Sequence, residues 1–291
     1  MDNIYCYRAT KEEKFQKFLL NEKRKKNFRK KSIATSSEYV DVYLYYPSEY
    51  NEETLPVYFN FHGGGFVLGY CEQDGPACQF LADHANCIVV NVDYLLAPEH
   101  KFPEPTVTSA EVILSILKRA DEYSIDADKV VIGGHSAGGS IAISACLQLR
   151  DLGHADSIKG IIADYVPVNL TISEEEEIQL ANDRNVDRMT QYKDWYLVEH
   201  GDGQNPLATP LYADLKGFPA FLIISAEYDP LRKDEEVLAD KLRKENVDVT
   251  YKCFEGCQHG FTHVLFEYNE EQAKKAWKLM GDFLIKCFRE I

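Results

Sequence analysis

The chain has 291 residues, of which 45% are hydrophobic, and its formal net charge is -15 at pH 7. This length and composition allow a large buried core, and the negative charge argues against nonspecific binding to nucleic acid or to an anionic membrane surface. No apolar run approaches the roughly 18 residues that a membrane-spanning helix needs, and the N-terminal residues lack the apolar stretch of a signal peptide, so we expect a soluble, cytoplasmic protein.

Basic residues concentrate at the start of the chain. Residues 1–31 contain eleven Lys or Arg and four Asp or Glu, whereas the remainder is acidic. We expect residues 1–35 to be helical, to contribute no strand, and to dock on the acidic body of the protein. An arm that binds nucleic acid is the alternative, and the overall charge argues against it.

Apolar runs of strand length recur after residue 40, separated by segments with helical spacing. The expected strands cover residues 42–46, 57–61, 87–92, 129–134, 158–166, 219–226 and 247–254. The expected helices cover residues 107–122, 139–152, 232–245 and 269–288, where apolar residues recur every three or four positions. Several strands are apolar on both faces, which is typical of a mostly parallel sheet flanked by helices, and the more alternating early strands fit an antiparallel start.

Residues 169–205 interrupt this alternation with a polar segment that includes SEEEEIQLANDRNVDRMTQYKDWYLVEH. An insertion of this length in an α/β domain usually forms a lid or a binding element. The sequence contains no internal repeat or low-complexity linker between two domains. We therefore expect one α/β core, residues 36–168 and 206–291, with an N-terminal cap segment, residues 1–35, and a cap insertion, residues 169–205.

Eight cysteines are scattered along the chain. Without a secretory signal, this irregular spacing does not indicate a disulfide framework, so we expect free thiols. Cys253 and Cys257 are spaced like metal ligands, but no second pair stands at a matching distance, and we expect no metal site there.

The sequence KVVIGGHSAGGS places a turn of small residues between a strand and a helix. Residues 134–138, GHSAG, match the nucleophile elbow G-x-S-x-G, in which a strained turn exposes the hydroxyl of Ser136. Gly134 and Gly138 allow neighbouring chain to pass closely on both sides. A phosphate-binding loop is the weaker alternative, because no lysine follows the glycines.

The sequence FHGGGFVLG, residues 61–69, puts three glycines directly after an expected strand. Acyl transfer needs hydrogen-bond donors at the point where the carbonyl oxygen becomes negative. The backbone N–H groups of Gly63 and Gly64, together with that of Ala137, can supply such donors without side-chain reorganisation. We expect these three residues to form an oxyanion hole, and a flexible glycine loop is the alternative.

A base and a carboxylate would complete this site in the chain order serine, acid, histidine. Asp229 lies just beyond the expected strand 219–226, and His259 lies in a turn beyond the strand 247–254. His259 can take the proton of Ser136, and Asp229 can hold the imidazole in the required tautomer.

Other residues compete for these two roles. Glu227 and Asp234 are the alternative carboxylates, and we favour Asp229 because Pro230 marks the turn from strand to helix. His263 is the alternative base.

Together, these motifs closely resemble the hormone-sensitive lipase family of α/β-hydrolases. The resemblance covers most of residues 40–290 and rests on HGGGFVLG, DYLLAPEHKFPEP, GHSAGG and the segment from PLYADLKGFPAFLIISAEYDPL to GCQHGF, in the right order and spacing. It implies the α/β-hydrolase fold and a carboxylic-ester hydrolase with Ser136, Asp229 and His259 as its triad. It also implies an oxyanion hole at Gly63, Gly64 and Ala137, and a cap made from the N-terminal segment and the insertion.

Two residues depart from the family pattern. His135 stands where the family usually has Asp before the serine, and Leu95 replaces the Arg of the YRLAPE motif. Neither departure removes a member of the triad, and the consequence of His135 is left open.

The leading hypothesis is a soluble serine esterase that hydrolyses short acyl esters through an acyl-enzyme, with a small-molecule ester as partner and no metal or organic cofactor. The preference for short chains is a family expectation, which fits a charged insertion whose main apolar bulk is Tyr192, Trp195 and Tyr196. An amidase or peptidase can use the same triad. A ligand-binding protein can use the same scaffold, as the plant gibberellin receptors do, but those lack the catalytic histidine that His259 would supply. An exposed edge strand of the sheet can pair with that of a second copy, so a homodimer is an alternative to a monomer.

Overall fold

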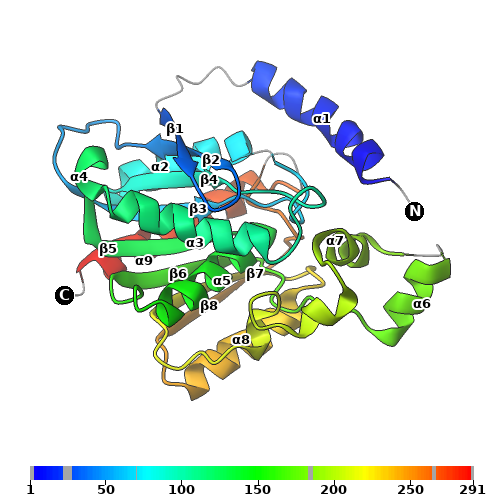
Figure 1. Ribbon diagram of the computed structural model, residues 1–291. Helices are drawn as coiled ribbons and strands as arrows, with labels where there is room; N and C mark the ends of the chain where they lie inside the picture. The colour runs from blue at the N-terminus through cyan, green and yellow to red at the C-terminus, as the bar shows by residue number, and fades with distance from the viewer. Residues whose placement is uncertain (1–2, 22–27, 70, 183–185, 264–266, 290–291) are drawn as a thin grey trace.

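The computed structural model describes residues 3–21, 28–69, 71–182, 186–263 and 267–289 of the chain (Figure 1). The strands are β1 (Phe28–Ala34), β2 (Tyr39–Tyr45), β3 (Leu55–Phe61), β4 (Ile88–Asp93), β5 (Ile125–His135), β6 (Ile158–Asp164), β7 (Ala220–Ala226) and β8 (Val249–Phe254). The α-helices are α1 (Ile4–Asn21), α2 (Gly75–Ala85), α3 (Glu104–Leu117), α4 (Ala120–Tyr123), α5 (Ala137–Asp151), α6 (Glu174–Asn182), α7 (Arg188–Tyr196), α8 (Arg232–Lys244) and α9 (Glu270–Arg289). Short 3-10 helices are η1 (Cys71–Asp74), η2 (His200–Gln204) and η3 (Pro210–Tyr212).

These strands form one sheet in the order β1-β2-β4-β3-β5-β6-β7-β8. The pairs β1–β2 and β2–β4 are antiparallel, and every later pair is parallel. Parallel neighbours need crossover connections, which helices supply along the sequence. The expected mostly parallel sheet with an antiparallel start is confirmed.

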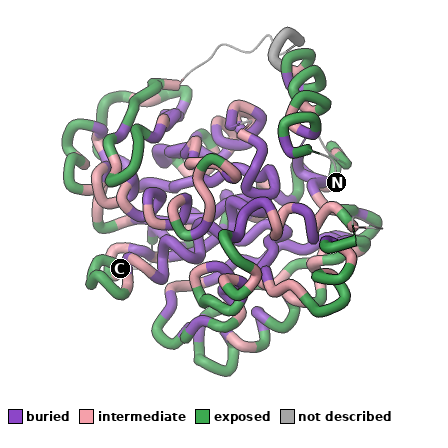
Figure 2. Tube along the Cα trace, turned by 45° about the vertical axis from the view of Figure 1, so that its right-hand side comes forward, coloured by how far each residue is buried: buried purple, intermediate pink, exposed green. Residues whose placement is uncertain are grey.

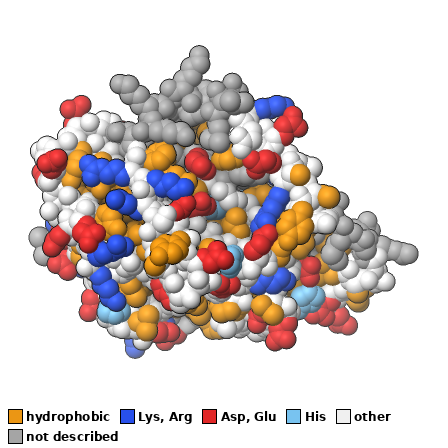
Figure 3. Space-filling view, turned by 45° about the horizontal axis from the view of Figure 1, so that its top comes forward, with side chains coloured by type: hydrophobic (Ala, Val, Ile, Leu, Met, Phe, Trp, Pro, Cys, Tyr) orange, Lys and Arg blue, Asp and Glu red, His pale blue; other side chains and the backbone are white. Residues whose placement is uncertain are grey.

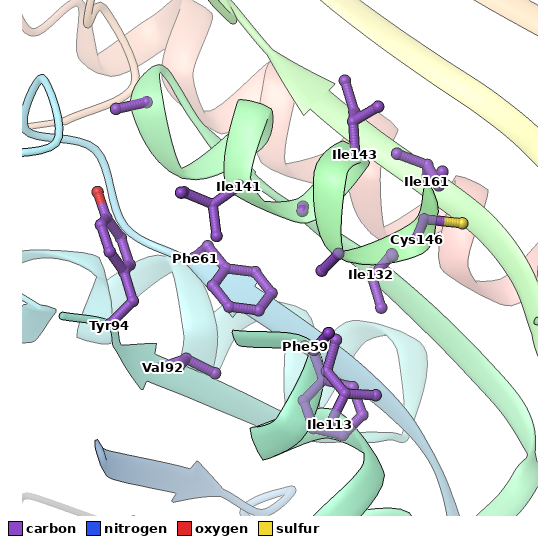
Figure 4. Close-up of a cluster of buried hydrophobic side chains, with 14 of the residues drawn as sticks. Phe59, Phe61, Val92, Tyr94, Ile113, Ile132, Ile141, Ile143, Cys146 and Ile161 are labelled. Carbon is purple, nitrogen blue, oxygen red and sulfur yellow. The ribbon is translucent and has the colours of Figure 1, made fainter. Parts of the chain in front are cut away.

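The core has one apolar layer on each face of the sheet. Successive strand residues point to opposite faces, so Phe59 packs in the layer that contains α3 and α5, whereas its neighbour Tyr58 packs in the layer that contains α2 and α9. Figure 4 shows the first layer, with Ile113 of α3 beside Phe59 and Ile141 of α5 beside Phe61. Burial on both faces accounts for the strand-length apolar runs of the sequence.

The expectation that residues 1–35 contain no strand is wrong for their last part. Phe28–Ala34 forms β1, which pairs along its whole length with β2. Only Ile33 of this strand is buried, so the sequence shows no apolar alternation. Charged residues such as Lys30, which pairs with Asp41 at 2.6 Å, are common on edge strands because they discourage pairing with other chains. The sheet therefore begins at Phe28, and residues 1–2 and 22–27 of the expected cap segment lie outside the described residues.

The N-terminal helix α1 docks on the body of the protein. Tyr7 and Phe15 are buried against the core, while the outer surface of the helix is exposed (Figure 2). Arg8 donates hydrogen bonds to the carbonyl oxygens of Val67, at 2.8 Å, and Ala97, at 2.6 Å. It also forms a two-pronged ion pair with Glu99, at 2.7 and 2.9 Å. Arg8 thus joins α1 to an acid of the body, and Tyr7 and Phe15 add apolar contacts.

Two further sequence expectations concern membranes and cysteines. Of the helices formed by described residues, none combines the length and the apolar character that crossing a membrane requires. The structure describes all eight cysteines, no two of which form a disulfide, and six of them are buried.

The parallel strands bring distant loops to one edge of the sheet. The loops that follow the carboxyl ends of β3, β5, β7 and β8 all emerge there, which is where ligands bind in open α/β sheets. The insertion between β6 and β7 carries α6 and α7 on the same side of the molecule (Figure 1).

Candidate active site

Ser136 occupies a strained turn between β5 and α5. Its φ of 50° and ψ of -126° lie in a region that non-glycine residues rarely adopt. Its N–H donates to the carbonyl oxygen of Asp164 at 2.9 Å. A Cβ atom at Gly134 would lie 2.3 Å from the carbonyl oxygen of Phe61, and one at Gly138 would lie 2.1 Å from it. Glycine is therefore required at both positions for the turn to pack against β3.

The hydroxyl of Ser136 lies at one end of a chain of three polar side chains. Its Oγ lies 2.9 Å from Nε2 of His259, and Nδ1 of His259 lies 2.7 Å from Oδ2 of Asp229. The Asp229 carboxylate is buried, and its Oδ1 accepts a hydrogen bond from the N–H of Leu231 at 2.9 Å. The ring of Tyr165 packs edge-on against the His259 imidazole, with 5.0 Å between ring centroids. The sequence-predicted serine, histidine and aspartate therefore meet in the order that proton transfer requires.

The competing residues have other partners. Glu227 accepts a hydrogen bond from the N–H of Gly256 at 2.7 Å. Asp234 lines the cavity described below. His263 is buried, and its Nδ1 lies 2.7 Å from the hydroxyl of Tyr165. Of these candidates, Asp229 and His259 are the pair that reaches Ser136.

The glycine loop after β3 lies against the elbow. A Cβ atom at Gly63 would lie 3.5 Å from Cβ of Ser136, and Gly64 has a φ of 140° with Leu68 O only 2.4 Å from the position of a Cβ. In the described turns and loops, the N–H groups of Gly63, Gly64 and Ala137 donate to no backbone oxygen. Of the three expected donors, Gly63 lies against Ser136 and Ala137 follows it directly in the chain.

A cavity of about 680 Å³ opens above Ser136 and His259. The glycine loop, Phe66 and Tyr165 contribute to its walls, together with residues of α1 and α7. Charged side chains of both signs, among them Lys11, Arg188 and Glu176, also line it. The surface in Figure 3 likewise intersperses acidic, basic and apolar side chains.

Helices α1 and α7 contact each other over this cavity. Asp187 caps the start of α7 by accepting a hydrogen bond from the N–H of Thr190 at 3.0 Å. Tyr7 of α1 hydrogen-bonds through its hydroxyl to that of Tyr192. The guanidinium of Arg188 lies 4.0 Å from the centroid of the Tyr7 ring, a favourable cation–π geometry. The N-terminal segment and the insertion therefore meet through an aromatic contact above the serine.

A second polar cluster lies behind the elbow. Nδ1–H of His135 donates to Oδ2 of Asp164 at 2.8 Å. Nε2 of His263 lies 3.0 Å from Oδ1 of Asp74, and Nε2 of His135 lies 3.9 Å from Oδ2 of Asp74. All four side chains are buried. Among the described residues, Asp74, His135 and His263 form the one group whose ligand atoms lie close enough together to hold a metal ion.

The pKa values in this cluster shift in different directions. Burial would raise the pKa of Asp74, but the neighbouring imidazoles, His263 first, outweigh it and lower that pKa to about 2. Burial would lower the pKa of His135, but the hydrogen bond with Asp164 and the charge of Asp74 raise it. Burial and then His135 lower the pKa of His263. The cluster therefore keeps a buried negative charge at Asp74 through neutral pH.

Sequence reasoning did not single out Asp74, Asp164 or Tyr165. Asp164 and Tyr165 lie at the carboxyl end of β6, next to the elbow strand. An acid at the end of an apolar strand, as in the sequence IIADYV, was the available signal for Asp164. Asp74 lies in a short 3-10 helix after the glycine loop and carried no comparable signal.

Comparison with known proteins agrees with this geometry. Residues 58–263 match the model of a protein family whose description is "alpha/beta hydrolase fold". An arylesterase from Saccharolobus solfataricus is 31% identical over 204 residues, which are 69% of this chain and 67% of the relative. The chain belongs to the hormone-sensitive lipase-like family of α/β-hydrolases. An acetyl esterase from Salmonella agona is 29% identical over 239 residues, 80% of this chain and 73% of the relative.

Solved structures of α/β-hydrolases extend this similarity to almost the whole of this chain. An esterase from Pyrobaculum calidifontis superposes with a TM-score of 0.85 at 29% identity, covering 98% of this chain and 93% of that one. A thermophilic carboxylesterase cloned from a metagenomic library gives a TM-score of 0.87 at 28% identity, covering 99% and 98%.

Proposed function

We propose that this α/β-hydrolase is a serine carboxylesterase that hydrolyses short-chain acyl esters of small molecules. The observation that carries the proposal is the chain from Ser136 Oγ through His259 to Asp229, with distances of 2.9 and 2.7 Å, at the floor of a cavity. The names of the similar proteins, an arylesterase and an acetyl esterase, support the reaction class.

The first half of the reaction forms an acyl-enzyme. Ser136 Oγ attacks the acyl carbon while its proton passes to His259 Nε2, and Asp229 stabilises the imidazolium that results. The carbonyl oxygen becomes negative and is stabilised by the N–H groups of Gly63, Gly64 and Ala137. When the tetrahedral intermediate collapses, the bond to the alcohol breaks and His259 returns the proton to the leaving oxygen.

The second half removes the acyl group. Water attacks the acyl carbon and gives its proton to His259 Nε2. The second tetrahedral intermediate breaks the bond to Ser136, whose Oγ takes the proton back. The products are an alcohol and a carboxylic acid, and the protein returns to its starting state without a redox step.

We assign the choice of substrate to a cap made of α1 and residues 169–205. Tyr7 of α1 and Tyr192 of α7 bond to each other and line the cavity, so they limit the space over Ser136. Lys11 and Arg188 at the same wall make it unfavourable for a long apolar chain. A cytoplasmic location and a homodimeric state stay predictions from the sequence, and the proposed reaction depends on neither.

The test is a rate series on p-nitrophenyl esters from acetyl to long acyl chains, with Ser136→Ala measured in parallel. We expect the highest kcat/KM for the shortest chains, and a loss of activity in the variant with unchanged circular dichroism. A p-nitroanilide with the same acyl group tests the amidase alternative. Equal rates in wild type and variant on every ester would refute the proposal, and faster cleavage of the anilide than of the ester would replace it with an amidase.

A further inference from the structure

We propose that Asp74, His135 and His263 form a binding site for a divalent transition-metal ion of the zinc type. The three residues come from η1, from the end of β5 and from the loop after β8. They lie behind the elbow, and none of them belongs to the triad. One ligand atom from each lies within 4.8 Å of the other two.

Each candidate ligand is oriented by a hydrogen bond on its other polar atom. Oδ2 of Asp74 accepts from Nδ2 of Asn60 at 2.8 Å. Nδ1 of His135 is held by Asp164 at 2.8 Å, and Nδ1 of His263 by the hydroxyl of Tyr165 at 2.7 Å. Such outer partners fix the ring orientation and tautomer of histidines that bind metals. Asp74 Oδ1 and the two Nε2 atoms are left to face one another.

Three atoms that can act as metal ligands face one another behind the elbow. Asp164 is an acceptor, so His135 Nδ1 carries a hydrogen, and Thr262 Oγ1 donates to the same carboxylate at 3.0 Å. Nδ1 of His263 lies 2.7 Å from the hydroxyl of Tyr165 and 2.9 Å from that of Thr262. In the neutral forms with the ring hydrogens on Nδ1, which metal binding requires, both Nε2 atoms present lone pairs toward the Asp74 carboxylate.

A cation stabilises buried acceptors that face one another. Neither Asp74 Oδ1 nor His263 Nε2 makes a hydrogen bond of acceptable geometry within the described part of the chain, although the two atoms are 3.0 Å apart. One divalent ion satisfies all three acceptors at once.

The spacing of the candidate ligand atoms and their access from the cavity both fit such an ion. Zinc bonds of about 2.1 Å in a tetrahedral site place ligand atoms roughly 3.4 Å apart. The three candidate ligand atoms lie within 4.8 Å of one another, so shifts of up to about 1.4 Å bring them to this spacing. His135, His263 and Gln73 also line the cavity, which provides an entry path and room for water as a fourth ligand.

The test uses the full-length Ser136→Ala protein, so that failure of the esterase proposal and failure of the metal site are separate results. After treatment with a chelator, the protein is titrated with Zn²⁺ by calorimetry and with Co²⁺ by visible absorption. We expect one ion per chain, a tetrahedral or five-coordinate cobalt spectrum, and a zinc-dependent rise in the unfolding temperature.

Ligand variants and a triad control locate the ion. His263→Gln and His135→Gln should each weaken binding by roughly 100-fold or more, and Asp164→Asn by about 10- to 100-fold. His259→Gln should bind as the parent does. Binding to the parent protein is measured directly, so the result does not depend on whether a buried variant folds.

Several results would overturn the proposal. These are the absence of saturable binding, binding that is lost in His259→Gln and retained in His263→Gln, and a cobalt–thiolate charge-transfer band, which would assign the ion to cysteines. A zinc-independent unfolding temperature would also contradict it.

Discussion

Ser136 and His259 lie 123 residues apart in the chain, yet Oγ of the serine lies 2.9 Å from Nε2 of the histidine. The loops after β5 and β8 carry them to the same edge of the sheet. Asp229, after β7, reaches the far side of the same imidazole. The contact therefore depends on the parallel order of the strands. The role of each of these three residues can be tested by a separate substitution.

Replacing Asp229 with Asn should lower kcat by about 10³- to 10⁴-fold with little change in KM. The amide cannot hold His259 in the tautomer that accepts the serine proton, nor stabilise the imidazolium. The matched control is Asp240→Asn in α8, where the carboxylate is exposed and forms an ion pair with nearby Arg243. Steady-state kinetics on p-nitrophenyl acetate measure both, and an Asp229→Asn protein within tenfold of wild type would rule out this role.

Gly64→Ala should lower kcat by about 10²- to 10³-fold, because it disturbs the donors beside Ser136. A Cβ there would lie 2.4 Å from the carbonyl oxygen of Leu68, so the loop has to shift. Gly153→Ala is the control, since Gly153 also has a positive φ, of 74°, but nothing lies within 4 Å of its added Cβ. The control should lose about 1 kcal/mol of stability and keep its kcat. Equal kcat in the two variants would contradict the role of the loop.

Arg8→Gln should loosen the docking of α1. The change removes charged hydrogen bonds to Val67 and Ala97 and the ion pair with Glu99, which together stabilise the docked helix by about 2 kcal/mol or more. We expect faster proteolysis within residues 4–21 and a broader acyl-chain preference. Lys17→Gln removes only an exposed pair with Glu13 and should change neither. An unchanged cleavage rate and substrate profile in Arg8→Gln would show that α1 does not act as a cap.

Glu235 should make the protein less stable as pH rises. Burial raises the pKa of this carboxyl well above 4.5, while hydrogen bonds from Ser225 and from the N–H of Val166 act in the opposite direction. A group with a raised pKa in the folded state contributes its full stabilisation below the unfolded pKa and loses it as pH rises toward the folded pKa. The loss therefore begins near pH 4.5 and continues upward.

Glu235→Gln should flatten this part of the stability curve, because the amide stays neutral. Urea unfolding midpoints measured from pH 4.5 upward compare the variant with wild type. The neighbouring Glu236→Gln, at an exposed position, serves as control and should keep the wild-type slope. Parallel curves for wild type and Glu235→Gln would show that the carboxyl does not govern this pH dependence.

Most of the core strands could be predicted from the sequence, and so could Ser136, His259 and Asp229, because local patterns encode them. Strands buried on both faces appear as apolar runs. Ser136, Asp229 and His259 each follow the end of a strand within five residues, at the edge where the fold brings such loops together.

The remaining features depend on contacts between distant segments. Strand β1 is an exposed edge, so its sequence carries charges in place of alternation. The contact between Tyr7 and Tyr192 joins residues 185 positions apart, and no local pattern predicts it. The cluster of Asp74, His135 and His263 likewise combines three separate segments. His135 stood out in the sequence as a departure from the family pattern and His263 as the alternative base, but no local pattern places them beside Asp74.

The acyl-enzyme on Ser136 is tested most directly by labelling the protein with a short-chain p-nitrophenyl phosphonate, whose phosphorus atom takes the place of the acyl carbon. Intact mass and peptide mapping then locate the adduct. We expect one phosphonyl group per chain on the peptide that contains Ser136, loss of esterase activity in step with labelling, and no adduct in Ser136→Ala. A folded, active protein that is not labelled at Ser136, or that is inactivated by a label on another residue, would contradict the proposed mechanism.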